Sequence, residues 1–456
     1  MRNASEYIRR ELMIRLVRAF DENILAEELD RIPIRLRPAN AVASRCCVYH
    51  DRAVLKYRLM ALLGIGCEDE TDEARPVSSY LDELPEDGAP LTVCAAGCSG
   101  CPDSKFIVNG NCRGCFARPC VYNCPRGAIT IENRVSKIDY DKCIKCGKCM
   151  NVCPFQAIMK TTVPCEESCP VGAIRKNGFG TAEIDFSLCI FCGRCFNKCP
   201  FGAILERSQM FRVLTALRER PLVAMVAPSA ESQFPGSLEQ FFEAIRRLGF
   251  AAVVEVAKGA EETIVNEAAE LLEKSAAGLP VMTTSCCPSY VEFVRKHLPE
   301  FSGHVSHTPS PMIYTARMAR SKYPDAVTVF IGPCIAKRHE AAQFDEVDYV
   351  LSFEEIGAML AGRGIDVIAQ EAGAFREPAI DIARKFAVSG GVAAAVQAEL
   401  SRKCPDFELK AQAVNGIDKK TKAILKAHAA GKFGANFVEV MACEGGCARG
   451  PGAICR

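Results

Sequence analysis

Three short cysteine segments, each following an apolar run, carry the clearest chemistry in this sequence. They are Thr284-Ser285-Cys286-Cys287-Pro288, Gly332-Pro333-Cys334-Ile335-Ala336-Lys337 and Met441-Ala442-Cys443-Glu444-Gly445-Gly446-Cys447. The runs before them (PVMTT, VTVFI and NFVEVM) are rich in β-branched residues and predict buried parallel strands. Cysteines at the carboxyl ends of such strands can converge on one crevice, where open α/β sheets bind ligands. Four thiolates gathered there would bind an iron–sulfur cluster or another soft metal.

A second group of cysteines has the spacing of bacterial ferredoxins. Two complete runs end in Cys-Pro, namely Cys143, Cys146, Cys149, Cys153 and Cys189, Cys192, Cys195, Cys199. A variant run consists of Cys112, Cys115, Cys120 and Cys124, and a truncated run keeps only Cys165 and Cys169. The hexapeptides CPRGAI, CPFQAI, CPVGAI and CPFGAI mark four copies of one unit.

Pairing these units predicts the clusters, because the fourth cysteine of each run ligates the other cluster in two-cluster ferredoxins. The first pair of units predicts one cluster on Cys112, Cys115, Cys120 and Cys153 and another on Cys143, Cys146, Cys149 and Cys124. The second pair predicts a third cluster on Cys189, Cys192, Cys195 and Cys169. We hypothesise a fourth cluster on Cys98, Cys101, Cys165 and Cys199; the alternative is a degenerate ferredoxin half that holds no cluster.

Six cysteines stay unassigned: Cys46, Cys47, Cys67, Cys94, Cys404 and Cys455. Free cysteines commonly act as small buried hydrophobes, and we expect this of Cys67 and Cys404. Cys46, Cys47 and Cys94 could instead lie near a cluster.

The elements that must position these cysteines fall into three regions, as the length of 456 residues suggests. Residues 1–91 have a mainly helical pattern that ends in the polar segment 71–91, and residues 92–207 hold the ferredoxin-like units. From 208 to 456, runs such as LVAMVAP, AAVVEVA and DYVLSF alternate with helical stretches. The expected fold is therefore multidomain, α+β and α/β: a helical segment, tandem ferredoxin-like domains and a C-terminal α/β domain.

Composition excludes several classes of protein. The 27 cysteines have metal-ligand spacings rather than the even density of a small secreted disulfide scaffold. A formal charge of +1 argues against nucleic acid as a partner. No apolar run approaches the ~20 residues needed to span a bilayer. The N-terminus, MRNASEYIRRELMIRLVRAF, predicts an amphipathic helix rather than a signal peptide, so we expect a reducing cytoplasmic location and no membrane partner.

The three C-terminal motifs resemble the signature of the iron-only, or FeFe, hydrogenases in order, spacing and neighbouring residues. The resemblance implies that the α/β domain holds an H-cluster, a 4Fe–4S cube joined by one cysteine to a diiron unit with CO, cyanide and a bridging dithiolate. Cys287, Cys334, Cys443 and Cys447 would hold the cube, and Cys447 would also bridge to the diiron unit. The alternative for this C-terminal site is a simple 4Fe–4S electron-transfer cluster.

The resemblance also implies a proton relay. Cys286 matches the thiol that exchanges protons with the dithiolate, and Glu267, Ser306 and Glu270 match the remaining positions, with water filling gaps. Two glutamates three residues apart share a helix face, which is otherwise usually a solvated face. Buried carboxylates would have raised pKa values that suit a relay.

Other residues match the positions that hold the diiron unit. Lys337 matches a lysine that binds one cyanide. The segment Ala227-Pro228-Ser229 matches the one packed against the dithiolate, with Ser229 donating to the other cyanide.

The sequence departs from the well-studied enzymes at several of these motifs. Gly332 replaces a methionine, Met312 replaces a glutamine, Tyr290 replaces a tryptophan, and the last motif continues as Arg449-Gly450-Pro451-Gly452. Together with the variant ferredoxin units, these changes resemble the monomeric branch often called group B.

The expected function is the reversible reduction of protons to H2. Electrons would pass through three to four additional 4Fe–4S clusters from or to a ferredoxin-like carrier. Separate maturation proteins would insert the diiron unit, because no side chain makes CO or cyanide. No Rossmann fingerprint is visible, which argues against direct use of NAD. The alternatives are an H2 sensor with the same cofactor, a non-catalytic iron–sulfur scaffold and an electron-transfer subunit.

Overall fold

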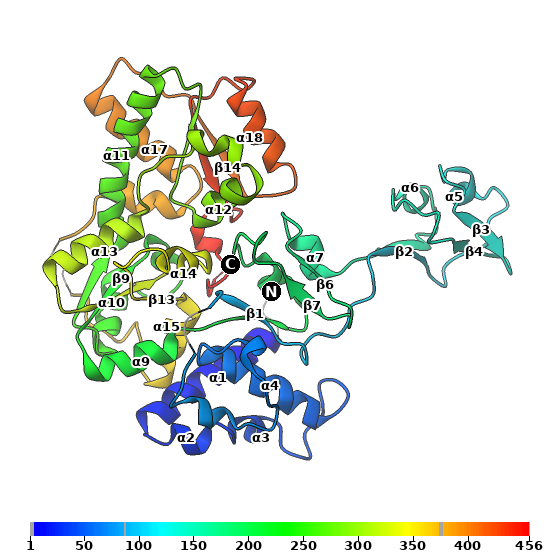
Figure 1. Cartoon of the computed structure of the whole chain (residues 1–456), viewed down its shortest axis with the longest axis horizontal. Coiled ribbons are helices and arrows are strands. Elements are labelled where there is room, and N and C mark those ends of the chain that lie inside the picture. The colour runs from blue at the N-terminus through cyan, green and yellow to red at the C-terminus, as the bar shows by residue number, and fades with distance from the viewer. Residues whose placement is uncertain (1–3, 86–87, 374–376, 456) are drawn as a thin grey trace.

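The N-terminal part of the chain is a helical layer packed on the C-terminal body (Figure 1). The computed structural model describes residues 4–85, 88–373 and 377–455. The layer consists of α1 (Ala4–Asp21), α2 (Leu25–Glu28), α3 (Ile32–Leu36) and α4 (Val48–Leu62). The buried face of α1 includes Leu12, Leu16 and Val17, and the helix packs against α15 (Phe353–Gly362). The first three residues of the predicted N-terminal helix, and residues 86–87 of the predicted polar segment, lie outside the described residues.

The first two ferredoxin units form a separate lobe, residues 105–161, that projects from the molecule (Figure 1). Strand β2 (Lys105–Val108) pairs antiparallel with β5 (Ile158–Thr161), and β3 (Ile129–Glu132) pairs antiparallel with β4 (Val135–Ile138). The short helices α5 (Pro119–Tyr122) and α6 (Lys148–Asn151) contact each other. We call this the projecting lobe.

The last two units form an inner module, residues 91–101 and 162–206, which lies between the projecting lobe and the body (Figure 1). Strand β1 (Leu91–Val93) pairs with β8 (Ile204–Glu206), and β6 (Ile174–Lys176) pairs with β7 (Ala182–Ile184), all antiparallel. The helices α7 (Pro164–Ser168) and α8 (Arg194–Lys198) pack together. The inner module repeats the pattern of the lobe: two strand pairs and two short helices.

The body contains two parallel sheets. One has the order β10 (Ala252–Glu255), β9 (Leu222–Val226), β12 (Val327–Ile331), β13 (Tyr349–Leu351), and the other has the order β11 (Met282–Thr283), β15 (Phe437–Met441), β14 (Ala411–Asn415). Every residue of β9, β12 and β15 is buried, as expected of apolar runs covered on both faces. The apolar runs singled out in the sequence thus form parallel strands, and these strands belong to two sheets rather than one.

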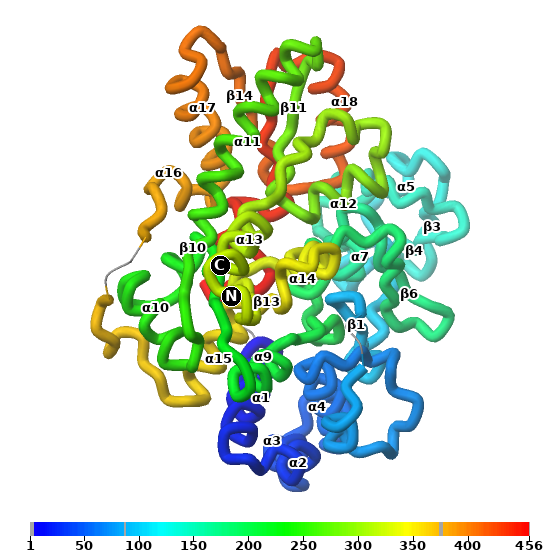
Figure 2. The backbone as a smooth tube through the Cα atoms, turned by 60° about the vertical axis from the view of Figure 1, so that its left-hand side comes forward, coloured from blue at the N-terminus to red at the C-terminus, as the bar shows by residue number. Residues whose placement is uncertain are grey.

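Helices cover both sheets. They are α9 (Met210–Glu219), α10 (Leu238–Arg247), α11 (Val256–Ala276), α12 (Pro288–His297), α13 (Pro311–Lys322), α14 (Ala336–Ala341), α16 (Asp381–Arg384), α17 (Gly391–Lys403) and α18 (Thr421–Ala429). The long helix α11 starts directly after β10 of the first sheet and packs against α17, which contacts the second sheet (Figure 2). This helix therefore joins the two halves of the body.

A buried charge network ties α14 to its surroundings. The guanidinium of Arg338 donates from Nη2 to Glu355 at 2.5 Å and pairs through Nη1 with Glu206 at 2.7 Å. Burial raises the pKa of Glu206 to about 7, although the charge of Arg338 opposes that rise. Because Glu206 lies in β8 and Glu355 in α15, this one arginine holds the inner module, α14 and the body together.

We predict that Arg338→Met lowers the free energy of unfolding by about 3–5 kcal/mol, because it leaves two buried carboxylates without their counter-ion. The matched control is Arg317→Met, which removes an ion pair at 2.9 Å whose arginine side chain is 47% exposed. That change should cost at most about 1 kcal/mol. Urea unfolding measures both variants, and equal shifts of the two midpoints would contradict the role given to Arg338.

Candidate metal centre and proton route

The three cysteine motifs meet in one apolar cavity at the carboxyl ends of strands from both sheets. Cys286 and Cys287 follow β11, Cys334 follows β12, and Cys443 follows β15, while Cys447 begins a single 3-10 turn. The cavity is also lined by Ala227, Pro228, Ser229, Met312, Phe330, Lys337 and Phe386. The structure thus brings the four expected cluster ligands and the expected cofactor-packing segment into one space.

These thiols cannot all be ionised by themselves. Burial and then repulsion from the neighbouring thiols raise the pKa of Cys334 and of Cys447 to about 12, and the pKa of Cys443 is raised well above its usual range. Iron would supply the missing positive charge. Within the described ranges, no three His, Cys, Asp or Glu side chains lie close enough to share a single metal ion. A 4Fe–4S cube would spread its ligands over four iron atoms.

Glycine permits the turn between Cys443 and Cys447. Gly445 and Gly446 have φ values of +86° and +91°, which side chains rarely adopt. A Cβ on Gly446 would lie 2.5 Å from the carbonyl oxygen of Ala387. Only glycine lets the chain pass here with both cysteines facing the cavity.

Ser229 and Lys337 are polar residues of the cavity wall that could contact a bound ligand. The hydroxyl of Ser229 is buried and makes no hydrogen bond within the described residues. The Lys337 Nζ donates to Glu340 at 2.6 Å and to the Ser310 hydroxyl at 2.9 Å. Burial alone would lower the pKa of Lys337, but Glu340 raises it above its usual value, so the ammonium stays charged. A free hydroxyl and a buried ammonium suit an anionic ligand.

The departure at Gly332 has a steric reason. A Cβ there would lie 2.6 Å from Cε1 of the Phe330 ring, which itself lines the cavity. Phe330 thus occupies the space that a side chain at position 332 would need. Met312 is fully buried and completes the same wall.

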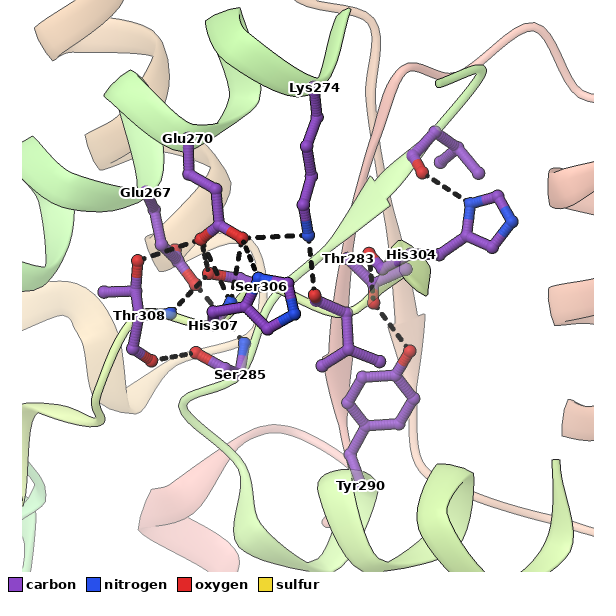
Figure 3. Close-up of polar contacts among 12 residues, drawn as sticks. Glu267, Glu270, Lys274, Thr283, Ser285, Tyr290, His304, Ser306, His307 and Thr308 are labelled. Atoms are coloured by element: carbon purple, nitrogen blue, oxygen red, sulfur yellow. Dashed lines mark hydrogen bonds and ion pairs between the residues drawn. The ribbon is translucent and has the colours of Figure 1, made fainter. Parts of the chain in front are cut away.

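Glu267 is the innermost carboxylate of the polar route in Figure 3. It is fully buried, and its Oε1 accepts the Ser285 N–H at 3.3 Å while Oε2 has no hydrogen-bond partner in the described residues. Burial raises the pKa of Glu267 to about 8. Burial and then the charge of Glu267 also raise the pKa of Cys286 well above its usual range. Both groups hold their proton near neutral pH.

One helical turn further along α11, Glu270 has the opposite character. It accepts from the Ser306 hydroxyl at 2.5 Å and pairs with Lys274 at 2.8 Å and with the His307 ring at 3.1 Å (Figure 3). Burial alone would raise the pKa of Glu270, but Lys274 and then Ser306 lower it to about 2. The His307 side chain is 78% exposed, so the route reaches solvent there.

Four members of this network escaped the sequence interpretation: Ser285, Lys274, His307 and Thr308. The Ser285 hydroxyl donates to the Thr308 carbonyl at 2.5 Å, and the Thr308 hydroxyl donates to Glu270 at 3.1 Å. No motif marks the last three, although Lys274 stands four residues after Glu270, a spacing that predicts a contact on one helix face.

Two small cavities in the projecting lobe each gather four cysteines. One is lined by Cys112, Cys115, Cys120 and Cys153, and the other by Cys124, Cys143, Cys146 and Cys149. These are the two sets that unit pairing predicts.

The inner module gathers two further groups. Burial, and after it the charges of neighbouring thiols that include Cys169, raise the pKa of Cys189, Cys192 and Cys195. In the second group, burial and then the charge of Cys199 raise the pKa of Cys101 and of Cys165, and Cys98 also acts on Cys101. Cys192 also lines the central cavity, so this group adjoins the cysteines of the C-terminal motifs.

The four hexapeptide repeats share one hydrogen bond. In each, the alanine N–H donates to the sulfur of the first cysteine, at 3.2 to 3.4 Å: Ala128 to Cys124, Ala157 to Cys153, Ala173 to Cys169 and Ala203 to Cys199. The residue before each alanine has a positive φ and is glycine in three repeats and Gln156 in the fourth. Hydrogen bonds to cluster sulfurs influence reduction potentials, so the repeat would combine a cluster ligand with the group that tunes it.

Two of the six unassigned cysteines differ from expectation. Cys67 and Cys404 are half-buried rather than buried, whereas Cys94 is fully buried and hydrogen-bonded to Cys67. None of the 27 cysteines, all of which lie in the described residues, forms a disulfide.

Comparison with known families agrees with this geometry. Residues 220–451 match the model described as iron only hydrogenase large subunit, C-terminal domain, which is half of the chain. The chain belongs to the iron-only hydrogenase family. Residues 136–159 match a 4Fe-4S binding domain and residues 159–210 match the LdpA Fe-S cluster-binding domain. These matches support iron–sulfur clusters and an H-cluster as the cofactors of this hydrogenase-family chain.

Similar proteins include iron hydrogenase 1 of Clostridium pasteurianum, 28% identical over 379 residues, or 69% of this chain and 64% of the relative. The NADP-reducing hydrogenase subunit HndD of Solidesulfovibrio fructosivorans is 28% identical over 402 residues, covering 69% of this chain and 63% of its own. This hydrogenase-family chain thus spans just under two thirds of the length of these relatives. A solved FeFe hydrogenase of Chlamydomonas reinhardtii covers 54% of this chain and 84% of its own, with 24% identity and a TM-score of 0.47. No helix in the described ranges is long and apolar enough to cross a membrane.

We predict that the double change Cys98→Ser and Cys101→Ser removes about four iron atoms per chain from the reconstituted protein, because it takes two of the four ligands of one cluster. Cys404→Ser, a half-buried cysteine outside all these groups, is the control and should keep the full iron content. Iron analysis with EPR of the reduced protein measures both. An unchanged iron content in the double variant would mean that this half holds no cluster.

Proposed function

We propose that this chain is a hydrogenase that reversibly reduces protons to H2 at an H-cluster held by Cys287, Cys334, Cys443 and Cys447. The observation that carries the proposal is the position of Cys286. Its sequence neighbour is a proposed ligand, its own thiol lines the cavity, and Glu267 lies near enough to shift its pKa. An electron-transfer cluster needs no such proton donor beside its ligands.

When bound, the diiron unit would supply the iron site at which protons and electrons combine. Cys447 would bridge it to the cube. The Ser229 hydroxyl and the Lys337 ammonium would donate to its anionic cyanide ligands, for which both already stand in the cavity wall. The apolar side chains of Met312, Phe330 and Phe386 would keep water out.

Protons would pass between Cys286 and solvent through Glu267, Ser306 and Glu270. Cys286 and Glu267 carry protons near neutral pH, whereas Glu270 is ionised and hydrogen-bonded to the exposed end of the route. The unpaired Oε2 of Glu267 leaves an open position for a bridging water between the two carboxylates. Proton transfer along such a chain needs donors and acceptors in alternation, which this arrangement supports.

Electrons would enter at the projecting lobe and pass through the inner module. Between residues 105 and 161 the sequence has ten Lys and Arg against three Asp and Glu, although the whole chain is close to neutral. Cys146, in the second cysteine group of the lobe, is exposed, and its neighbour Ile144 is 58% exposed. We propose that an acidic, ferredoxin-like carrier docks there. We also place the chain in the group B branch, on the variant motifs described above.

The first test is H2 evolution from a reduced viologen under anoxic conditions, on protein matured with a diiron unit and normalised to its CO and cyanide infrared bands. Cys286→Ala should lower turnover by at least about 100-fold at unchanged band intensity, because the proton donor is lost. Cys404→Ala should leave turnover unchanged. Diiron bands without turnover in the unaltered protein would favour an H2 sensor, and no bands would favour a scaffold or an electron-transfer subunit.

A second prediction concerns the carrier. Arg126→Glu with Lys145→Glu reverses two exposed charges on the projecting lobe and should slow electron delivery from an acidic ferredoxin at low ionic strength by about 10-fold or more. The effect should fade at high salt. Lys419→Glu with Lys432→Glu makes the same charge change at exposed positions of the body and should have little effect. Similar losses in both double variants would argue against docking on the lobe.

A further inference from the structure

Cys46, Cys47 and His50 form a polar group at the amino end of α4, outside the metal centre. Both thiols are exposed. The Cys46 sulfur lies 3.1 Å from Nδ1 of His50 and 3.8 Å from the Cys47 sulfur. Two thiols and an imidazole within contact distance are the groups that thiol chemistry requires.

The hydrogen bonds of His50 determine which of its nitrogens can act as a base. Its Nε2 lies 2.7 Å from the carbonyl oxygen of Ala96. A carbonyl only accepts, so Nε2 carries the hydrogen and donates. In the neutral ring Nδ1 is then unprotonated, and the Cys46 thiol donates to it. A nucleophile bonded to a base that a third group orients is the arrangement of an activated thiol.

Cys47 differs from Cys46 in its surroundings. It is the N-cap of α4, a helix of 15 residues, and its sulfur accepts the backbone N–H of His50 at 3.4 Å. That hydrogen bond is the largest contribution lowering the pKa of Cys47. The second thiol is therefore readily ionised and stands beside the first.

We propose that Cys46, Cys47 and His50 form a thiol–disulfide exchange site for low-molecular-weight disulfides. His50 takes the proton of Cys46, whose thiolate attacks the disulfide to form a mixed disulfide and release one thiol. Cys47 then attacks the Cys46 sulfur, forming a Cys46–Cys47 disulfide and releasing the second thiol. Two protein thiols are oxidised as one small disulfide is reduced to two thiols, so the electrons balance.

The oxidised form is readily reversed. Adjacent Cα atoms are about 3.8 Å apart, whereas the Cα atoms of ordinary disulfides are about 4.4–6.8 Å apart. The ring is therefore strained, and strained disulfides are the easily reduced ones. A metal ion is a weaker explanation, since in the described residues no three such side chains are placed to hold one.

The exchange site is joined to the loop that carries Cys98. Besides the bond from His50 to Ala96, the Arg45 guanidinium donates to the Gly97 carbonyl at 2.8 Å. Oxidation of Cys46 removes the thiol that donates to His50 Nδ1. Because the same ring donates from Nε2 to Ala96, this change takes place one hydrogen bond away from the loop. The site goes beyond the proposed hydrogenase activity, which uses none of these three residues.

The test uses the cluster-loaded protein, treated with cystamine under anoxic conditions, alkylated and digested with trypsin. Cleavage after Arg45 and Arg52 isolates the peptide CCVYHDR. We expect this peptide to lose two hydrogens in the unaltered protein and to keep a cystamine adduct in Cys47→Ser. The corresponding peptide of Cys46→Ser should react more slowly than that of the unaltered protein, because it lacks the thiol that contacts His50 Nδ1. Cys455, an exposed thiol that donates to the Gln233 carbonyl oxygen at 4.0 Å, is the internal reference and should react at least about 10-fold more slowly than Cys46.

His50→Gln should reduce the rate at which Cys46 reacts with cystamine to the rate of Cys455, and it should leave the iron content unchanged. Tyr49→Phe, at the exposed neighbouring position, is the matched control and should keep the rate of the unaltered protein. The proposal is wrong if Cys46 and Cys455 react equally fast in the unaltered protein, if Cys46→Ser leaves the peptide as reactive as before, or if His50→Gln has no effect.

Discussion

Four thiols that line one apolar cavity cannot all be thiolates unless a cation lies among them, and much of this fold follows from that constraint. Their pKa values rise because burial and mutual repulsion both oppose ionisation. The fold must therefore hold them at positions that only a bound cluster makes favourable. It does so by placing them after three strand ends, where the backbone is fixed by parallel pairing, and by a glycine turn that admits no side chain.

The same dry cavity explains the two glutamates of α11. Glu267 and Glu270 are one helical turn apart, yet one has a pKa near 8 and the other near 2. Among the described residues the inner carboxylate has no positive partner, whereas the outer one accepts hydrogen bonds from Lys274 and Ser306. A neutral acid inside and an ionised one outside would suit the proposed proton route without placing an unpaired charge beside the proposed cluster ligands.

The ferredoxin-like part of the chain, proposed to carry electrons, consists of four copies of one structural unit. Each of the four units ends in a cysteine whose sulfur accepts an alanine N–H, so one local structure would supply both a cluster ligand and the hydrogen bond that tunes it. The units differ mainly in their surroundings. Two are in the basic projecting lobe, and the other two form the inner module, which lies between that lobe and the body. Arg338 fixes the inner module to α14 and α15, which keeps Cys192 at the wall of the central cavity.

Local features of the sequence determined the apolar strands, the cysteine units and the family, because each depends on residues close together in the chain. The sequence also determined that Glu267 and Glu270, three residues apart, share one face of a helix. Only the tertiary structure decided that the cysteine motifs follow strands of two sheets, that Phe330 fills the space beside Gly332, and that Lys274, Thr308 and His307 complete the route from Glu267. It also decided that His50 meets Cys46 and the carbonyl of Ala96. These outcomes depend on which distant surfaces pack together. A shifted pKa or a steric contact arises only after that packing has fixed the distances between groups and removed the water around them.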